Sequence, residues 1–312
     1  MSFSEQFRNI YCIDTRMFGF KQYCAAYLIK GKELALIDTG MASQKAALLE
    51  GIQAHGFSVS DISYIFVTHC DHFDHSGNVG AIIRENPKAK IYIHPSGIEC
   101  LTHPEISSEK RKLRMPLAMA ARYGESISTP SSRIGLVRDG EIFDLGENVK
   151  LQVIFAPGHQ PDGLVLYEQQ HKGLFVNDLV GIYFADADCS YALNPLNSDH
   201  QQGIASLKRL MELPIERLYL GHYGIILERP KEVIYRAIQN MQQLLDIGAQ
   251  CIAENKPENI APKFWEIYMP ELMKLRKGRG EILYQYATQE HLPDQIKAFT
   301  KYCQEKFKEA GR

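Results

Sequence analysis

Short apolar runs alternate with longer helical patterns along the first part of the chain. Residues 24–40 hold two apolar runs on either side of a Lys-Gly-Lys turn signal, which predicts a β-hairpin whose second strand ends at Asp38. Residues 42–55 have apolar positions at helical spacing, 62–67 form a short strand of branched and aromatic residues, and 78–85 are helical before a strand at 90–94. This order of strand, helix, strand, polar loop, helix and strand predicts a layered α/β fold.

The pattern of the second part divides the chain in two. Residues 98–130 are mostly helical and indicate an insertion over one edge, and strand patterns return at 141–143, 149–155, 163–167, 174–176 and 217–220, with a helix at 201–212. Residues 231–312 are helical throughout, with breaks expected at Pro257, Pro262, Pro270 and Pro293. We therefore predict a main domain over 1–230, with the insertion at about 98–130, and a helical C-terminal extension over 231–312. The extension is a cap or a dimerisation element, so a homodimer stays open.

Composition and charge exclude several classes of partner. Lys plus Arg is 35 and Asp plus Glu is 37, so the chain lacks the basic excess of a nucleic-acid-binding protein. It has no apolar run of the ~18–20 residues that a membrane span needs, and its start does not resemble a signal peptide. Its seven cysteines, an odd number without a C-x-x-C pair, favour free thiols in a reducing compartment. We expect a cytoplasmic protein with a small-molecule substrate.

One polar loop concentrates metal-binding side chains. Residues 68–77 read THCDHFDHSG and place three histidines and two aspartates directly after the strand at 62–67. Imidazole nitrogen and carboxylate oxygen are ligands of zinc, iron and manganese. An N-cap role for Asp74 would not explain the three neighbouring histidines. Since α/β proteins place their chemistry at the C-terminal ends of strands, the loop predicts a metal site.

Three further potential ligands lie just past strands. His159 follows the strand at 149–155, Asp178 follows 174–176, and His222 follows 217–220. Each one alone is typical of a hydrogen-bonded loop residue, but their shared placement favours one common metal site. Histidines in polar or turn contexts are expected at the surface, and these are His55, His103, His171, His200 and His291.

Five motifs resemble those of the metallo-β-lactamase superfamily hydrolases. They are LIDTG at 36–40, THCDHFDHSG at 68–77, APGH at 156–159, ND at 177–178 and GHYG at 221–224, and they follow the order of the family. The resemblance implies an α/β (α+β) fold, a four-layer αββα sandwich whose two inner sheets are covered by helices, here with a helical C-terminal extension. Residues 1–230 would then be the metal-binding catalytic domain.

The resemblance also implies a ligand set for two divalent metal ions, with zinc as the first choice and iron or manganese as alternatives. One ion would be held by His69, His72 and His159, the second by Asp74, His75 and His222, and Asp178 would bridge the two. Asp38 would orient the histidine-rich loop by hydrogen bonding.

The histidine-rich loop departs from the family pattern His-x-His-x-Asp-His by one extra residue. Cys70 and Asp71 separate its first two histidines. Keeping His69 preserves the Thr-His pair that closes the strand. Two other registers stay open, with Asp71 in place of His72 or Cys70 in place of His69, and either would change the metal preference.

The resemblance, which extends to thioesterases of the glyoxalase II type and to acyl-homoserine lactonases, implies a metallo-hydrolase that cleaves a small ester, lactone or thioester. Two metal ions would lower the pKa of a shared water towards ~7, and the resulting hydroxide would attack the carbonyl. We count Asp74 and Asp178 among the catalytic residues as well as the ligands, and Asp178 or Asp71 would move the proton. Tyr183 and Tyr223 are candidates to stabilise the oxyanion because each is close in sequence to a ligand, although a packed aromatic ring is the simpler interpretation.

The alternative is a non-haem iron oxidoreductase of the same fold. A flavodiiron-like enzyme would carry a further α/β flavin domain, whereas residues 231–312 are helical, and a persulfide dioxygenase would use a single iron. Nucleic-acid processing would need an inserted nuclease domain and a basic surface, and the pattern shows neither. The identity of the metal discriminates between hydrolase and oxidoreductase.

Overall fold

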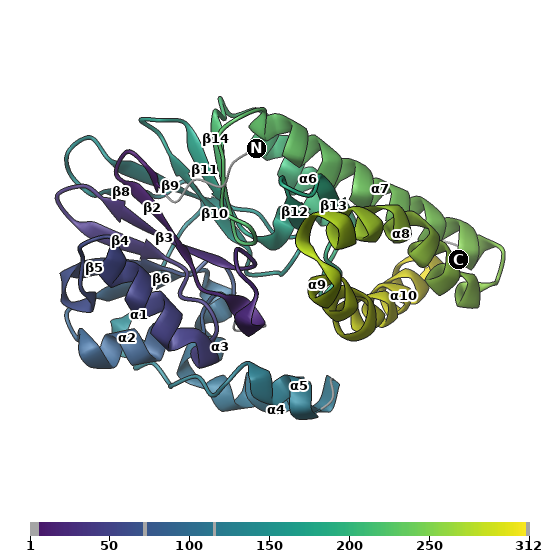
Figure 1. The fold of residues 1–312 in the computed structure, drawn as a ribbon, viewed down its shortest axis with the longest axis horizontal. Coiled ribbons are helices and arrows are strands. Elements are labelled where there is room, and N and C mark those ends of the chain that lie inside the picture. Colours follow the sequence, from purple (N-terminus) through teal and green to yellow (C-terminus); the bar gives the residue numbers. More distant parts are fainter. Residues whose placement is uncertain (1–5, 71–73, 115–116, 310–312) are drawn as a thin grey trace.

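Two β-sheets form the centre of the molecule (Figure 1). The structure is a computed structural model that describes residues 6–70, 74–114 and 117–309. The first sheet runs in the order β1 (Gln6–Phe7), β2 (Ile10–Asp14), β3 (Ala25–Lys30), β4 (Leu34–Ile37), β5 (Ile62–Phe66), β6 (Lys90–Ile93) and β7 (Ile134–Leu136). The second runs in the order β15 (Ile225–Ile226), β14 (Arg217–Leu220), β11 (Gly173–Val176), β10 (Leu164–Glu168), β9 (Lys150–Phe155) and β8 (Ile142–Asp144). Strands β12 (Ile182–Phe184) and β13 (Cys189–Tyr191) form a separate hairpin.

Helices cover both outer faces of the sheet pair (Figure 1). The α-helices of the main domain are α1 (Lys45–Ala54), α2 (Val79–Glu85), α3 (Ile98–Thr102), α4 (Pro104–Arg114), α5 (Leu117–Arg122) and α6 (His200–Met211). The chain ends with α7 (Pro230–Ala253), α8 (Ile260–Arg279), α9 (Glu281–Gln285), a π-helical turn (Tyr286–His291) and α10 (Leu292–Glu309). Among the described residues, no helix combines the length and the apolarity that crossing a membrane requires.

Three apolar layers hold the sandwich together. Between the sheets, the ring of Tyr27 on β3 lies 5.3 Å from that of Phe175 and 5.6 Å from that of Tyr219 on the opposite sheet. A second layer buries the inner faces of α1 and α2 against the first sheet, and a third buries α6, α7 and the later helices against the second. This is the four-layer αββα fold that the motifs implied, and helices extend it at the C-terminus.

The apolar pattern predicted the long and central elements and missed the short ones. The strands at 62–67 and 149–155 and the helices at 42–55 and 201–212 are confirmed to within a few residues. The pattern missed β1, β2, β7, β15 and the β12–β13 hairpin, and all of these except β2 have at most three residues. Such strands have few alternating positions by which they can be recognised.

Three predicted breaks in the C-terminal extension are wrong. Pro293 lies inside α10, which follows the π-helical turn without interruption. Pro262 and Pro270 both lie inside α8. Pro262 falls in the first turn, where the backbone N–H of any residue lacks a helical partner. The helix continues through Pro270 because one of its faces is buried, with Phe264, Tyr268 and Leu272 at most 1% exposed. Packing of this face outweighs the loss of one backbone hydrogen bond.

His200 is buried, contrary to the surface position that its sequence context predicted. His200 is the first residue of α6. Its imidazole contacts the amide oxygen of Asn194, and its ring centroid lies 5.5 Å from that of Phe299 on α10. Burial lowers the pKa of His200 from 6.5 to about 4. The side chain therefore stays neutral between the main domain and the last helix.

We expect metal-free protein to lose stability as the pH falls from about 6.5 to about 4. In this window the unfolded chain binds a proton at His200 that the folded chain does not, which costs the folded state about 3 kcal/mol in total. The measurement is urea unfolding across this pH range for the wild type and for His200→Gln. Parallel pH curves for the two proteins would show that His200 does not cause the loss.

Candidate metal centre

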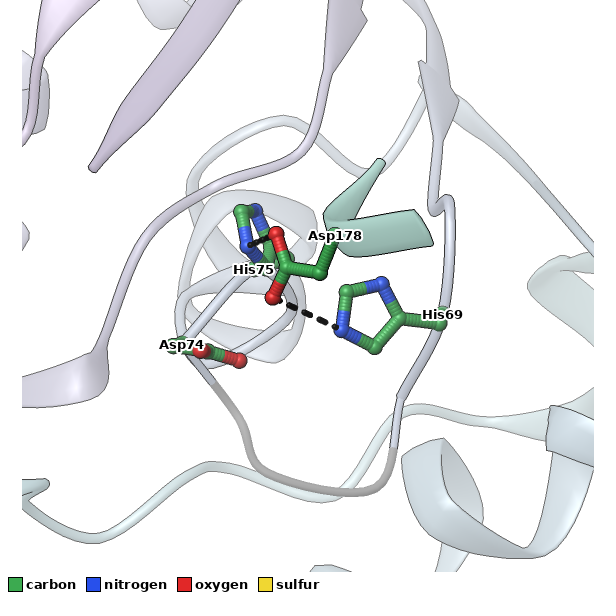
Figure 2. A group of neighbouring side chains, drawn as sticks. All are labelled: His69, Asp74, His75 and Asp178. Atoms are coloured by element: carbon green, nitrogen blue, oxygen red, sulfur yellow. Dashed lines mark hydrogen bonds and ion pairs between the residues drawn. The ribbon is translucent and has the colours of Figure 1, made fainter. Parts of the chain in front are cut away.

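Four histidines converge on the carboxylate of Asp178. The Asp178 Oδ1 atom lies 3.1 Å from Nε2 of His75, and Oδ2 lies 3.2 Å from Nε2 of His222, 3.6 Å from Nε2 of His159 and 3.7 Å from Nε2 of His69. Figure 2 shows this carboxylate between His75 and His69. All four imidazoles thus present the same ring nitrogen to one point, and every one of these side chains is at most 5% exposed.

Asp74 completes the group. One ligand atom each from His69, Asp74, His75 and Asp178 lies within 4.8 Å of the others (Figure 2). Among the described residues, Nε2 of His69 and Oδ1 of Asp74 are buried without a hydrogen-bond partner. Because a buried polar atom without a partner is costly, this arrangement fits a cation that would accept both lone pairs.

A backbone carbonyl and a buried carboxylate contact two of the ligands on their far sides. Nδ1 of His222 donates to the carbonyl oxygen of Tyr23 at 2.7 Å, and Nδ1 of His75 lies 3.3 Å from Oδ2 of Asp38. A proton on Nδ1 leaves the Nε2 lone pair free for a metal. Asp38 is held in turn by the backbone N–H of Thr68 at 2.9 Å and the Thr68 hydroxyl at 2.8 Å.

Gly221 lets the second sheet approach the site closely. A Cβ atom on this residue would lie 2.7 Å from Oδ1 of Asp178 and 2.9 Å from Cε1 of His75. Any larger side chain would therefore push the Asp178 carboxylate away from His75. Gly221 is a site residue that the ligand pattern alone does not identify, although it precedes His222.

Opposite charges within this buried group shift one another's pKa values. Burial alone would raise the pKa of Asp178, but His222 and His75 hold it well below its usual range. Burial would lower the pKa of His75, but Asp178 raises it well above its usual value, and the pKa of His222 also rises. In the metal-free site His75 and His222 therefore favour the protonated form, and a metal must displace these protons to bind.

The structure brings together six of the residues proposed as ligands from the sequence. They are His69, Asp74, His75, His159, Asp178 and His222. His72 and the alternative ligand Asp71 lie outside the described residues. The assignment of His72 therefore stays a prediction, as does the division of the ligands between two ions.

Cys70 forms a disulfide with Cys100, which corrects the expectation that the cysteines are free thiols. The register in which Cys70 replaces His69 is wrong for the same reason, since its sulfur is bonded to another sulfur and His69 points at Asp178. The other five cysteines are free and buried. Sequence spacing did not reveal the pair because 30 positions separate its members.

A cavity of about 290 Å³ opens onto the metal centre. Asp74, His159, Asp178 and His222 line it. Tyr23 and Tyr286 line it as well, and the sequence pattern gave no sign of this because more than 250 positions separate them.

The tyrosines predicted to stabilise an oxyanion lie elsewhere. The residues that line the cavity do not include Tyr183 or Tyr223. The guanidinium of Arg236 lies 5.9 Å from the ring of Tyr183, and that of Arg279 lies 5.8 Å from the ring of Tyr223. Their catalytic role stays a prediction that no contact in the cavity supports.

We expect Asp38→Asn to weaken metal binding about 10–100-fold, the usual effect of losing a partner behind a ligand. The amide cannot accept from both Thr68 and His75 as the carboxylate does. The measurement is the affinity for zinc in a competition assay with a chromophoric chelator. Asp246→Asn, an exposed position on α7, is the control. An affinity within twofold of the wild type would show that Asp38 does not position the site.

The sequence pattern of the Metallo-beta-lactamase superfamily matches residues 20–222. The match covers more than half of the chain and includes every described residue of the metal centre. The chain therefore belongs to the metallo-β-lactamase superfamily.

Solved structures share the fold at low sequence identity. The archaeal superfamily protein ST1585 from Sulfolobus tokodaii aligns with a TM-score of 0.61 at 21% identity, covering 77% of this chain and 87% of its own. The family protein TTHA1429 from Thermus thermophilus aligns with a TM-score of 0.59 at 20% identity, covering 86% and 93%. At these identities the likeness shows the fold alone.

Curated relatives differ in their chemistry. A putative diflavin flavoprotein A 1 from Nostoc is 26% identical over 211 residues, which cover 63% of this chain and 32% of the relative. Acyl-coenzyme A thioesterase MBLAC2 from Gallus gallus is 23% identical over 245 residues, which cover 74% of this chain and 83% of the relative. This chain spans about a third of the length of the flavoproteins that it matches.

Proposed function

We propose that the protein is a metal-dependent hydrolase that cleaves a small ester, lactone or thioester. One observation carries the proposal: imidazoles and carboxylates of the cluster line a cavity whose wall is apolar on one side and polar on the other. Such a cavity suits an organic substrate whose polar reacting group meets the cluster. The thioesterase MBLAC2, most of whose length aligns with this chain, adds support.

The ligand set fits divalent metal ions, with zinc as the first choice. His69, His159 and Asp178 would hold one ion together with His72, and Asp74, His75, His222 and Asp178 would hold the other. Bound metal would supply Lewis acidity and make water a nucleophile near neutral pH.

The chain's own residues would orient the substrate and move the proton. Asp74 and Asp178 are the carboxylates of the metal cluster that line the cavity, as do His159 and His222. Either carboxylate oxygen can accept a proton from water and return it to the leaving group. The apolar wall would exclude competing water from this transfer.

The test combines metal analysis with a substrate screen. Purified protein is analysed for zinc, iron and manganese and then assayed with lactones, thioesters and phosphoesters before and after chelation. We expect zinc, together with ester or thioester hydrolysis that chelation abolishes and zinc restores. Zinc-loaded protein inactive on all carbonyl substrates would refute the proposal.

A second candidate is an iron oxidoreductase. The flavoprotein relatives favour it, among them the flavo-diiron protein FprA2 from Clostridium acetobutylicum, which is 27% identical over 163 residues. This function would require iron in the purified protein and consumption of oxygen with an added reduced flavoprotein or a thiol. Iron content with such consumption, and no hydrolysis, would favour it over the hydrolase.

A further inference from the structure

The cavity at the metal centre is built from segments far apart in the sequence. Met17 follows β2, Met119 and Tyr123 come from the end of the inserted segment, and Tyr286 begins the π-helical turn of the C-terminal extension. The insertion and the extension therefore meet over the metal centre. Arg122 on α5 joins them through an ion pair of 2.6 Å with Glu290.

One part of the cavity wall is apolar and held firmly in place. Met17 is 4% exposed, Met119 is 9% exposed and Tyr123 is 7% exposed. The ring of Phe18 lies 5.1 Å from that of Tyr123 and 5.4 Å from that of Tyr286, and these contacts fix both tyrosine rings. Methionine side chains are unbranched and polarisable, so they adapt to a flexible apolar ligand.

The other part of the wall is charged but balanced. Asp294 and Lys297 on α10 form an ion pair of 3.2 Å, and Lys301 lies 3.7 Å from Glu305. On this side the cavity is lined by Glu290 and Asp294 as well as Lys297 and Lys301, so both signs of charge are present and neither is in excess. This part suits a leaving group that is polar or that stays solvated. A charged group placed among the methionines would instead lose its hydration without gaining a counter-ion.

We propose that Met17, Met119 and Tyr123 form an acyl pocket for the unbranched apolar acyl chain of the substrate. The proposal rests on the hydrolase function and specifies its substrate class. With the reacting carbonyl at Asp178 and His222, the acyl chain extends along the methionines, and the leaving group points past α10. The side chain of Met119 would then limit the length of the chain.

The experiment compares Met119→Ala with Met273→Ala, a control at a methionine of α8 that is 47% exposed. Holoenzyme is assayed with p-nitrophenyl esters of saturated acids from acetyl to myristoyl. Binding of the free fatty acids, and of dicarboxylic acids of equal length, is measured by calorimetry. Thermal unfolding checks that each variant folds, and Met17→Ala replaces Met119→Ala if the latter does not.

We expect kcat/KM of the wild type to rise about three- to fourfold per added methylene until the pocket is full and then to fall. Met119→Ala should move the optimum about two carbons longer, because it removes three side-chain atoms from the wall. Met273→Ala should leave it unchanged. Dicarboxylic acids should bind about tenfold more weakly than fatty acids of equal length.

The outcomes separate this proposal from the hydrolase function. Hydrolysis with no dependence on chain length, or with the same optimum in Met119→Ala, would overturn the acyl pocket and leave the hydrolase standing. Length-dependent binding that Met119→Ala shifts, without any hydrolysis, would support the pocket and count against the hydrolase. The absence of both binding and hydrolysis would overturn the two together.

Discussion

The Asp178→Asn variant should bind little metal, and its hydrolytic activity should fall about a hundredfold or more. The Asp178 carboxylate lies within 3.7 Å of Nε2 in each of four histidines, so its negative charge is next to every one of these imidazoles. A metal ion contributes several kcal/mol of charge stabilisation to the transition state, and each 1.4 kcal/mol corresponds to tenfold in rate. The neutral amide keeps the shape of the side chain but removes this charge.

The measurements on Asp178→Asn are metal content by elemental analysis and activity after reloading with zinc. Asp188→Asn is the matched control, since that carboxylate is 62% exposed in its side chain and pairs with Arg236 at 2.6 Å away from the site. We expect the control to retain metal and activity. Full metal content and activity in Asp178→Asn would mean that the site binds metal without the Asp178 carboxylate.

The same substitution should also change the metal-free protein. Asp178 raises the pKa of both His75 and His222 against the opposing effect of burial. Without it, burial dominates, and both imidazoles lose protons at a lower pH. Titration of the histidine resonances by NMR in metal-free protein should show both pKa values falling below 6.5, the ordinary value of an imidazole, whereas a general loss of structure would bring both of them to that value.

The metal centre could be predicted from the sequence because its ligands follow strands. His69, His159, Asp178 and His222 each come a few positions after an apolar run, and the ends of such strands meet at one edge of the sandwich. The motifs therefore predicted which residues are candidate ligands and that these residues lie close together. Local pattern and global fold agree at these positions.

The cavity could not be predicted in this way because long-range packing creates it. Tyr23 and Tyr286 contact one another, with ring centroids 5.8 Å apart, yet nothing in the neighbouring sequence of either residue points to the other. The same holds for Arg122 and Glu290. Side-chain contacts between an insertion and a C-terminal extension depend on how the whole chain folds, which periodicity does not encode.

The disulfide leads to the second large effect that we expect. Cys70 directly follows the ligand His69, and its bond to Cys100 ties the end of β5 to helix α3. The bond closes a segment of 30 positions, and the entropy that it removes from the unfolded chain corresponds to roughly 3–4 kcal/mol of stability. Cys100→Ser should therefore lower the free energy of unfolding by about this amount.

Reductant separates this effect from the loss of a cysteine side chain. Because the other five cysteines are free and buried, reductant acts on the Cys70–Cys100 bond alone. Urea unfolding of the wild type should shift with dithiothreitol to the midpoint of Cys100→Ser, and the variant should not respond. Thiol titration of the denatured wild type should find five reactive groups without reductant and seven with it. Seven groups in both cases would mean that the bond does not form.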